Sequence, residues 1–182
     1  MIDPAPFQQH LVGGALLALV AVAAYFDIRW RRIPNWLTFS GIVAGLALHA
    51  SLAGWAGLRL SAGGFLLGFA VYLLFYCIRA MGAGDVKLMG AVGAIAGPAG
   101  WFPVFLATAL AAGLIAIVVS LANGRLRKTL WNVGFLLFEL MHLRAPYYRR
   151  PELDVTSPLA IRTPHGVAIA AGVAVCVLLS WR

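Results

Sequence analysis

The sequence predicts an all-α integral membrane protein with six transmembrane helices and one further short helix at the membrane surface. Hydrophobic residues make up 62% of its 182 residues and charged residues only 11%. The mean hydropathy of +0.90 lies well above that of soluble globular domains. Several apolar runs approach the roughly 20 residues that cross a bilayer as a helix, and the alternating short segments of a membrane barrel are missing. We therefore expect a single membrane-embedded domain over residues 1–182.

Six apolar segments are separated by polar or basic connections or, after the fourth, by Gly97-Pro98, and Pro34 stops helix continuation before the second. The predicted spans are residues 11–26, 36–53, 62–78, 86–96, 103–122 and 164–181. A further apolar stretch at 131–143 is too short to span and is flanked by basic residues on both sides. That pattern indicates a helix lying on one leaflet in the last cytoplasmic connection. Residues 1–10 lack the basic region of a signal peptide, so the first segment is expected to be retained.

The distribution of Lys and Arg predicts how the chain is oriented in the membrane. With six spans, one orientation leaves only Arg59 and Arg182 outside and puts every other basic residue on the cytoplasmic side. By the positive-inside rule, both termini then lie outside. Asp27, which ends the first span, and Asp85, which opens the fourth, then lie at the same cytoplasmic surface.

The charge pattern argues against nucleic acid as a partner, and the cysteine pattern argues against disulfides and a metal site. The net charge of +8 resides in the connections and forms no basic face with interleaved aromatic residues, so nucleic acid is not an expected partner. Cys77 and Cys176 fall inside predicted spans and no CxxC pair is present, so neither a disulfide framework nor a metal site is expected. We expect no cofactor.

Asp27 and Asp85 are the candidate catalytic residues. A carboxylate beside hydrocarbon is costly unless it is paired, hydrated or protonated, so such residues mark functional sites. Two carboxyls brought together cannot both ionise cheaply, so the pair shares a proton and supplies one acid and one base. Such a pair hydrolyses a peptide bond through an activated water, without a metal. Helix dipoles favour an ionised Asp85 and a protonated Asp27, although Arg29 and Lys87 stand two residues away from them.

Simpler roles exist for both aspartates. Glycine followed by aspartate before a helix is ordinary N-cap chemistry, which would account for Asp85. Asp27 gains nothing from capping at a helix C-terminus, and its simpler interpretation is a solvated loop carboxylate.

Three stretches give the sequence a family resemblance: FDIRWRRIPNWLT at 26–38, GAGDVKLMGAVGAIAG at 82–97 and TPHGVAIAAGV at 163–173. Together they resemble the type IV prepilin peptidases, which are GxGD-type intramembrane aspartyl proteases. The resemblance is to the small peptidase-only form, because only about ten residues precede the first span and the CxxC-bearing domain of methylating relatives is not seen.

The resemblance implies both an activity and a location. It implies that Asp27 and Asp85 are the catalytic pair and that the substrate is a pilin or pseudopilin precursor. Cleavage would separate the leader from the apolar helix at the cytoplasmic face of the bacterial inner membrane. Where the chain has His165, related sequences often carry an aromatic residue, and packing at a helix start is preferred to a third catalytic role.

Residues beside the aspartates are candidates for shaping the site. Gly82 and Gly84 are expected to adopt backbone conformations closed to other residues and to leave room for the substrate. Lys87 and Arg31 are candidates for neutralising the carboxyl pair or binding an acidic substrate side chain, with topology-determining cations as the commoner alternative. In the IPN segment, Pro34 and Asn35 are the remaining candidates, and Asn35 is expected to cap or open the second helix.

Two other functions compete with proteolysis. A proton-coupled transporter also uses intramembrane carboxyls, but its site lies near the midplane between pseudo-symmetric halves. Here both aspartates are expected at one surface, and no internal repeat is evident. A non-catalytic scaffold would tolerate replacement of either aspartate. The identity of the pilin, the oligomeric state and the conformation of residues 123–163 do not follow from the sequence.

Overall fold

The computed structural model describes residues 6–124, 126–141 and 165–180, and all regular structure within them is helical. The helices are α1 (Pro6–Trp30), α2 (Asn35–Cys77), α3 (Ala83–Ala122), α4 (Leu126–Met141) and α5 (His165–Ser180). Among the described residues, three helices (α1, α2 and α3) are long and apolar enough to cross a membrane, and α5 is a shorter apolar helix. The all-helical, multi-pass membrane class predicted from the sequence is therefore confirmed.

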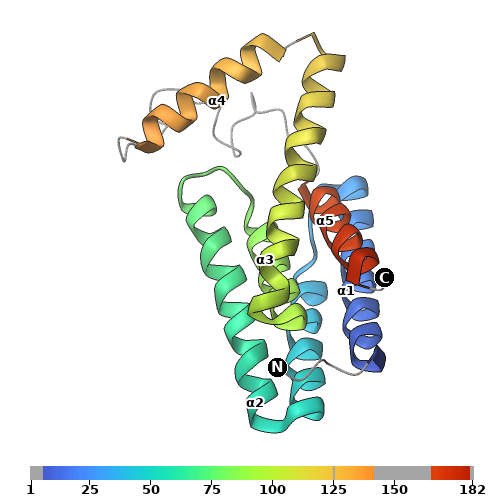
Figure 1. The fold of residues 1–182 in the computed structure, drawn as a ribbon. Coiled ribbons are helices and arrows are strands. Elements are labelled where there is room, and N and C mark those ends of the chain that lie inside the picture. The colour runs from blue at the N-terminus through green and yellow to red at the C-terminus, as the bar shows by residue number, and fades with distance from the viewer. Residues whose placement is uncertain (1–5, 125, 142–164, 181–182) are drawn as a thin grey trace.

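Helix α2 reverses its direction at Gly54, whose φ of 55° and ψ of −134° are closed to most other residues. Its two arms, residues 35–52 and 55–77, run side by side in opposite directions (Figure 1). The turn is shorter than the connection expected between the second and third predicted spans. Arg59 consequently lies within the second arm, with its guanidinium 5.5 Å from the centroid of the Trp55 ring.

Helix α3 is broken at Gly97, which has a φ of 70° and is followed by Pro98. Pro98 has no amide hydrogen to offer the Ala94 carbonyl, and an unpaired carbonyl is costly inside a membrane. Ser61 Oγ donates to that carbonyl at 2.7 Å. His49 Nε2 donates to the next carbonyl, that of Ile95, at 2.8 Å. The two arms of α2 thus supply the hydrogen bonds that the break in α3 removes.

The first arm of α3 is the centre of the bundle, because nearly every side chain between Val86 and Ile95 is buried. It packs against α2 through glycines, Gly93 among them. A Cβ atom on Gly64 would overlap the Gly93 carbonyl, and one on Gly93 would overlap the Gly64 carbonyl. On another side, α5 packs against both α1 and α3. Small residues therefore allow the close backbone approach that holds helices together in lipid.

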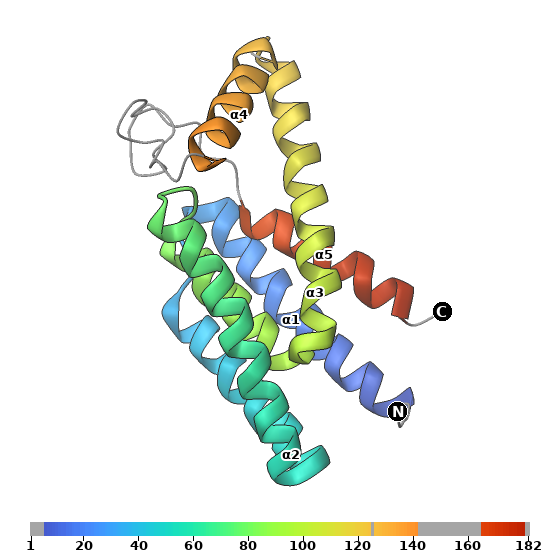
Figure 2. The same ribbon diagram turned by 60° about the vertical axis from the view of Figure 1, so that its left-hand side comes forward.

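Two helices extend beyond their predicted limits. Helix α1 continues to Trp30, so Asp27 lies in its last turn and not after it, and the Asp27 carbonyl accepts the Arg31 amide at 2.9 Å. Helix α4 begins at Leu126 and lies apart from the other helices (Figure 2). Most of the predicted connection beyond it, residues 142–164, lies outside the described residues.

Candidate active site

Both aspartates lie at the same end of the bundle. Asp27 is in the last turn of α1 and Asp85 is in the first turn of α3, and these two helix ends face the same way (Figure 1). The Asp27 side chain is buried, with 9% of its surface exposed, and Asp85 is half-buried. The two carboxyls are close enough for their charges to interact. Segments 58 residues apart in the sequence therefore meet at one site.

Asp27 is held by the N-terminus of α5. The backbone amide of Gly166 donates to Asp27 Oδ2 at 2.8 Å, joining residues 139 positions apart. This amide is one of the first four of its helix, which have no partner inside the helix and are available to a carboxylate. A Cβ atom at Gly166 would lie 3.0 Å from Asp27 Oδ2 and 3.1 Å from Asp27 Cβ, so a larger residue would fit only if the Asp27 side chain shifted.

The contact with α5 was not predicted, although Gly166 is part of the TPHG stretch. The contact also changes the electrostatic surroundings of the Asp27 carboxyl. The carboxyl lies near the C-terminus of α1, which opposes its ionisation, but it also faces the N-terminus of α5, which favours it. The two helix ends affect the ionisation of Asp27 in opposite directions, so helix dipoles alone do not show which aspartate is protonated.

Asp85 is anchored locally. Its Oδ2 accepts the backbone amide of Gly82, the residue that precedes α3, at 3.3 Å. The capping role considered for Asp85 is therefore present, and the carboxyl is still within range of the charge on Asp27. Gly82 itself has ordinary extended angles, with φ at −82° and ψ at 153°.

The conformational role predicted for Gly82 and Gly84 is wrong. Neither has a positive φ, and the left-handed residues nearby are Arg31 and Arg79, with φ values of 54° and 57°. Their Cβ atoms would make ordinary contacts at 3.4 Å, Gly82 with Asp85 and Gly84 with Ile33. Their small size leaves space at the surface of the site. The fold itself does not need that space, because a Cβ atom at either position would be accommodated.

The polar residues of the neighbouring connection interact with Lys87 and with Asp27. Asn35 is the first residue of α2 and so opens the helix, which is one of the two roles predicted for it, while Pro34 is the N-cap residue. Asn35 Oδ1 accepts a hydrogen bond from Lys87 Nζ at 2.9 Å, which ties the start of α2 to the first turn of α3. Arg31 is the cation whose charge acts on Asp27. The Lys87 ammonium therefore braces two helices next to the site, whereas Arg31 is the candidate for balancing charge.

Comparison with known proteins identifies the family. Residues 14–117 match the model of the type IV leader peptidase family, which covers more than half of the chain. The chain belongs to the type IV leader peptidase family. Comparisons with curated proteins and with solved structures gave no match. The matched region of this leader peptidase contains both aspartates, whereas α5 and its Gly166 lie beyond it.

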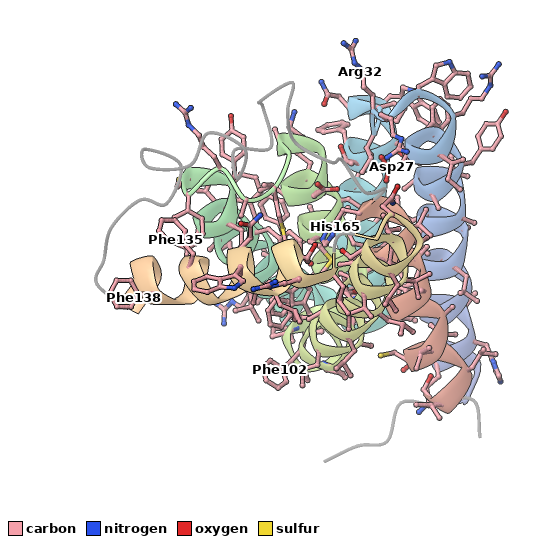
Figure 3. The ribbon with its side chains drawn as sticks, turned by 90° about the horizontal axis from the view of Figure 1, so that it is seen from above. Asp27, Arg32, Phe102, Phe135, Phe138 and His165 are labelled. Atoms are coloured by element: carbon pink, nitrogen blue, oxygen red, sulfur yellow. The ribbon has the colours of Figure 1, made fainter. Side chains whose placement is uncertain are left out.

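Two ring side chains complete the surroundings of the carboxyls in this leader peptidase. Tyr72, in the second arm of α2, is only 1% exposed, and its hydroxyl lies within electrostatic range of Asp85. Its ring centroid lies 6.1 Å from that of His165, the first residue of α5. Figure 3 looks down on this end of the bundle, where Asp27 and His165 lie among the helices and Arg32 points outward. Tyr72 was missed because an aromatic residue in an apolar run looks like ordinary core.

Proposed function

We propose that this peptidase removes the leader from type IV pilin or pseudopilin precursors, with Asp27 and Asp85 as an aspartyl catalytic pair. The observation that carries the proposal is the placement of the two carboxyls at one end of the bundle, within range of each other's charge and each anchored by a backbone amide. The family supports the peptidase activity and a pilin-type precursor as substrate.

The pair supplies a complete acid–base route for hydrolysis. The ionised carboxylate removes a proton from a water molecule, and the oxygen of that water attacks the scissile carbonyl carbon. The protonated carboxyl donates a hydrogen bond to the carbonyl oxygen and stabilises the tetrahedral intermediate. When the intermediate collapses, the carbon–nitrogen bond breaks and the departing amine takes up a proton from the pair. Asp27 and Asp85 exchange acid and base roles during one turnover.

We further propose six membrane crossings: α1, both arms of α2, both arms of α3, and α5. The breaks at Gly54 and Gly97 divide α2 and α3, which supports counting each arm separately. Helix α4 then lies on the cytoplasmic surface. The connections at the site end, residues 31–34 and 78–82, carry Arg residues, which supports placing this end in the cytoplasm and both termini outside. In the bacterial inner membrane, this orientation opens the pair to water and to the precursor leader.

The deciding experiment is cleavage of a precursor by the full chain. The chain and a leader-bearing type IV pilin precursor are reconstituted in liposomes, and the precursor mass is followed. We expect wild type to shorten the precursor, and Asp27→Asn and Asp85→Asn each to leave it at full length. Glu139→Gln makes the same carboxyl-to-amide change in another helix, α4, and should cleave normally. Full activity in either aspartate variant would exclude the aspartyl mechanism, whereas no cleavage by wild type would leave proton-coupled transport or a scaffold as alternatives.

A further inference from the structure

His165 has a buried hydrogen-bonding atom without a partner. In the part of the chain that the structure describes, three buried side-chain atoms lack one: Trp101 Nε1, Thr108 Oγ1 and His165 Nε2. A buried polar atom in this condition is unusual in a native protein and calls for an explanation. The unpaired condition of His165 Nε2 is where the inference begins.

Helix packing accounts for the first two atoms. Trp101 Nε1 lies 2.7 Å from the position a Cβ atom would take on Gly68, and Thr108 Oγ1 is packed against Gly172 in the same way. Both atoms are enclosed by the close approach of neighbouring helices. His165 lies instead at the start of α5, at the same end of the bundle as the carboxyl pair.

His165 has a neighbour of Asp27 on one side, Gly166, and a neighbour of Asp85 on the other, Tyr72. The next residue, Gly166, donates its amide to Asp27 Oδ2 at 2.8 Å. On the other side, the His165 ring lies 6.1 Å from the ring of Tyr72, which interacts electrostatically with Asp85. A peptide held between the two carboxyls therefore passes close to the His165 ring.

The chemistry of such a peptide indicates what the ring does. An α-helix engages its carbonyls in its own hydrogen bonds, so a segment must unwind before a carboxyl pair can reach its scissile bond. Unwinding leaves backbone carbonyls that need donors, and at the edge of a membrane the protein supplies them to carbonyls that water does not reach. A neutral imidazole with its proton on Nε2 is such a donor.

We infer that His165 Nε2 donates a hydrogen bond to a backbone carbonyl of the precursor beside the scissile bond. His165 is then a substrate-binding residue and takes no part in the proton transfers of the aspartate pair. The inference rests on the proposed function, because it needs a peptide substrate at the pair. It replaces the sequence-based expectation that this residue only packs at a helix start.

The test compares ring and amide substitutions at this position. His165→Phe keeps a ring against Tyr72 but removes the nitrogen, whereas His165→Gln carries an amide nitrogen to a similar distance from the backbone. Trp101→Phe is the matched control, because it also removes a buried and unpaired ring nitrogen. KM and kcat for cleavage of the precursor are measured with each full-chain variant in liposomes.

We expect His165→Phe to raise KM about three- to ten-fold with kcat nearly unchanged, as for loss of one hydrogen bond that is equally strong in the ground and transition states. His165→Gln should restore most of the affinity, and Trp101→Phe should behave as wild type. A wild-type KM for His165→Phe, or the same increase in Trp101→Phe, would overturn the inference.

Two further arms separate the possible failures. If His165→Phe does not fold, His165→Asn replaces it, because its shorter amide does not reach the Nε2 position; a wild-type KM then overturns the inference. If Asp27→Asn or Asp85→Asn still cleaves, the proposed function fails. If both aspartate variants are inactive and His165→Phe is normal, only the role of His165 fails.

Discussion

Replacing Gly166 by alanine tests how the active site is assembled. The new Cβ atom would lie 3.0 Å from Asp27 Oδ2, 3.1 Å from its Cβ and 3.3 Å from its Cγ. Ordinary carbon contacts are about 3.5–4.0 Å, so the carboxyl must move by a few tenths of an ångström and its hydrogen bond to the Gly166 amide must lengthen. Hydrogen bonds to charged groups contribute about 1.5–3 kcal/mol. Losing most of this in the transition state lowers kcat/KM about 10- to 100-fold, because each 1.36 kcal/mol is a factor of ten.

The assay combines precursor cleavage with thermal unfolding of the purified full chain. Two glycine-to-alanine controls distinguish the site from the fold. Gly113→Ala meets nothing within 4 Å and should affect neither activity nor stability adversely. Gly172→Ala, on the same helix as Gly166, would overlap the Thr108 backbone and should lower the unfolding temperature. Gly166→Ala should lose activity with a much smaller loss of stability. Wild-type cleavage by Gly166→Ala would refute the anchoring of Asp27 by α5.

Three further predictions concern the surroundings of the pair. Ser61→Ala leaves a buried carbonyl at the α3 break without its donor and should lower the free energy of unfolding by about 1–3 kcal/mol, measured by thermal or denaturant unfolding in detergent. Gly84→Ala should fold as wild type, because the new Cβ makes only ordinary contact, and an unfolded variant would contradict this expectation. A rise in KM without a loss of stability would show that the precursor passes beside Gly84. Lys87→Ala and Asn35→Ala should each lower the free energy of unfolding slightly, and a double-mutant cycle should give a coupling energy of about 0.5–1 kcal/mol. Additive effects would show that the Lys87–Asn35 hydrogen bond does not stabilise the protein.

The bundle was largely predictable because its determinants are local. Long apolar runs specify helices in a bilayer, and Gly97 with Pro98 breaks one of them without reference to the rest of the chain. The boundaries were less predictable. The segment after Phe26 was expected to be a loop, but Asp27 and Arg29 remain helical up to Trp30, because polar side chains at a membrane surface do not end a helix. The helix stops where Arg31 adopts a left-handed conformation, for which its sequence gives no indication.

The contacts that complete the site join residues far apart in the chain. The GAGD stretch marks Asp85 locally, but nothing near Asp27 indicates that an amide from α5 will reach it. The partners of His49 and Ser61 are equally hidden, because a carbonyl freed by a break in one helix can be satisfied from any neighbouring helix. Periodicity predicts which face of a helix is buried, and it does not specify which atoms meet there.

The different anchors of the two carboxyls have a consequence for stability and activity. Asp85 is held by Gly82, three residues away, and keeps its anchor as long as the start of α3 is intact. Asp27 is held by Gly166 and depends on the docking of α5, which has 16 residues and is the shortest apolar helix of the described bundle. Short terminal helices detach at a lower free-energy cost than the centre of a bundle. On warming, we therefore expect precursor cleavage to fall before the helical circular dichroism signal does, with Asp27 released first. Coincident loss of activity and helicity would show that α5 and the core of the bundle unfold as one unit.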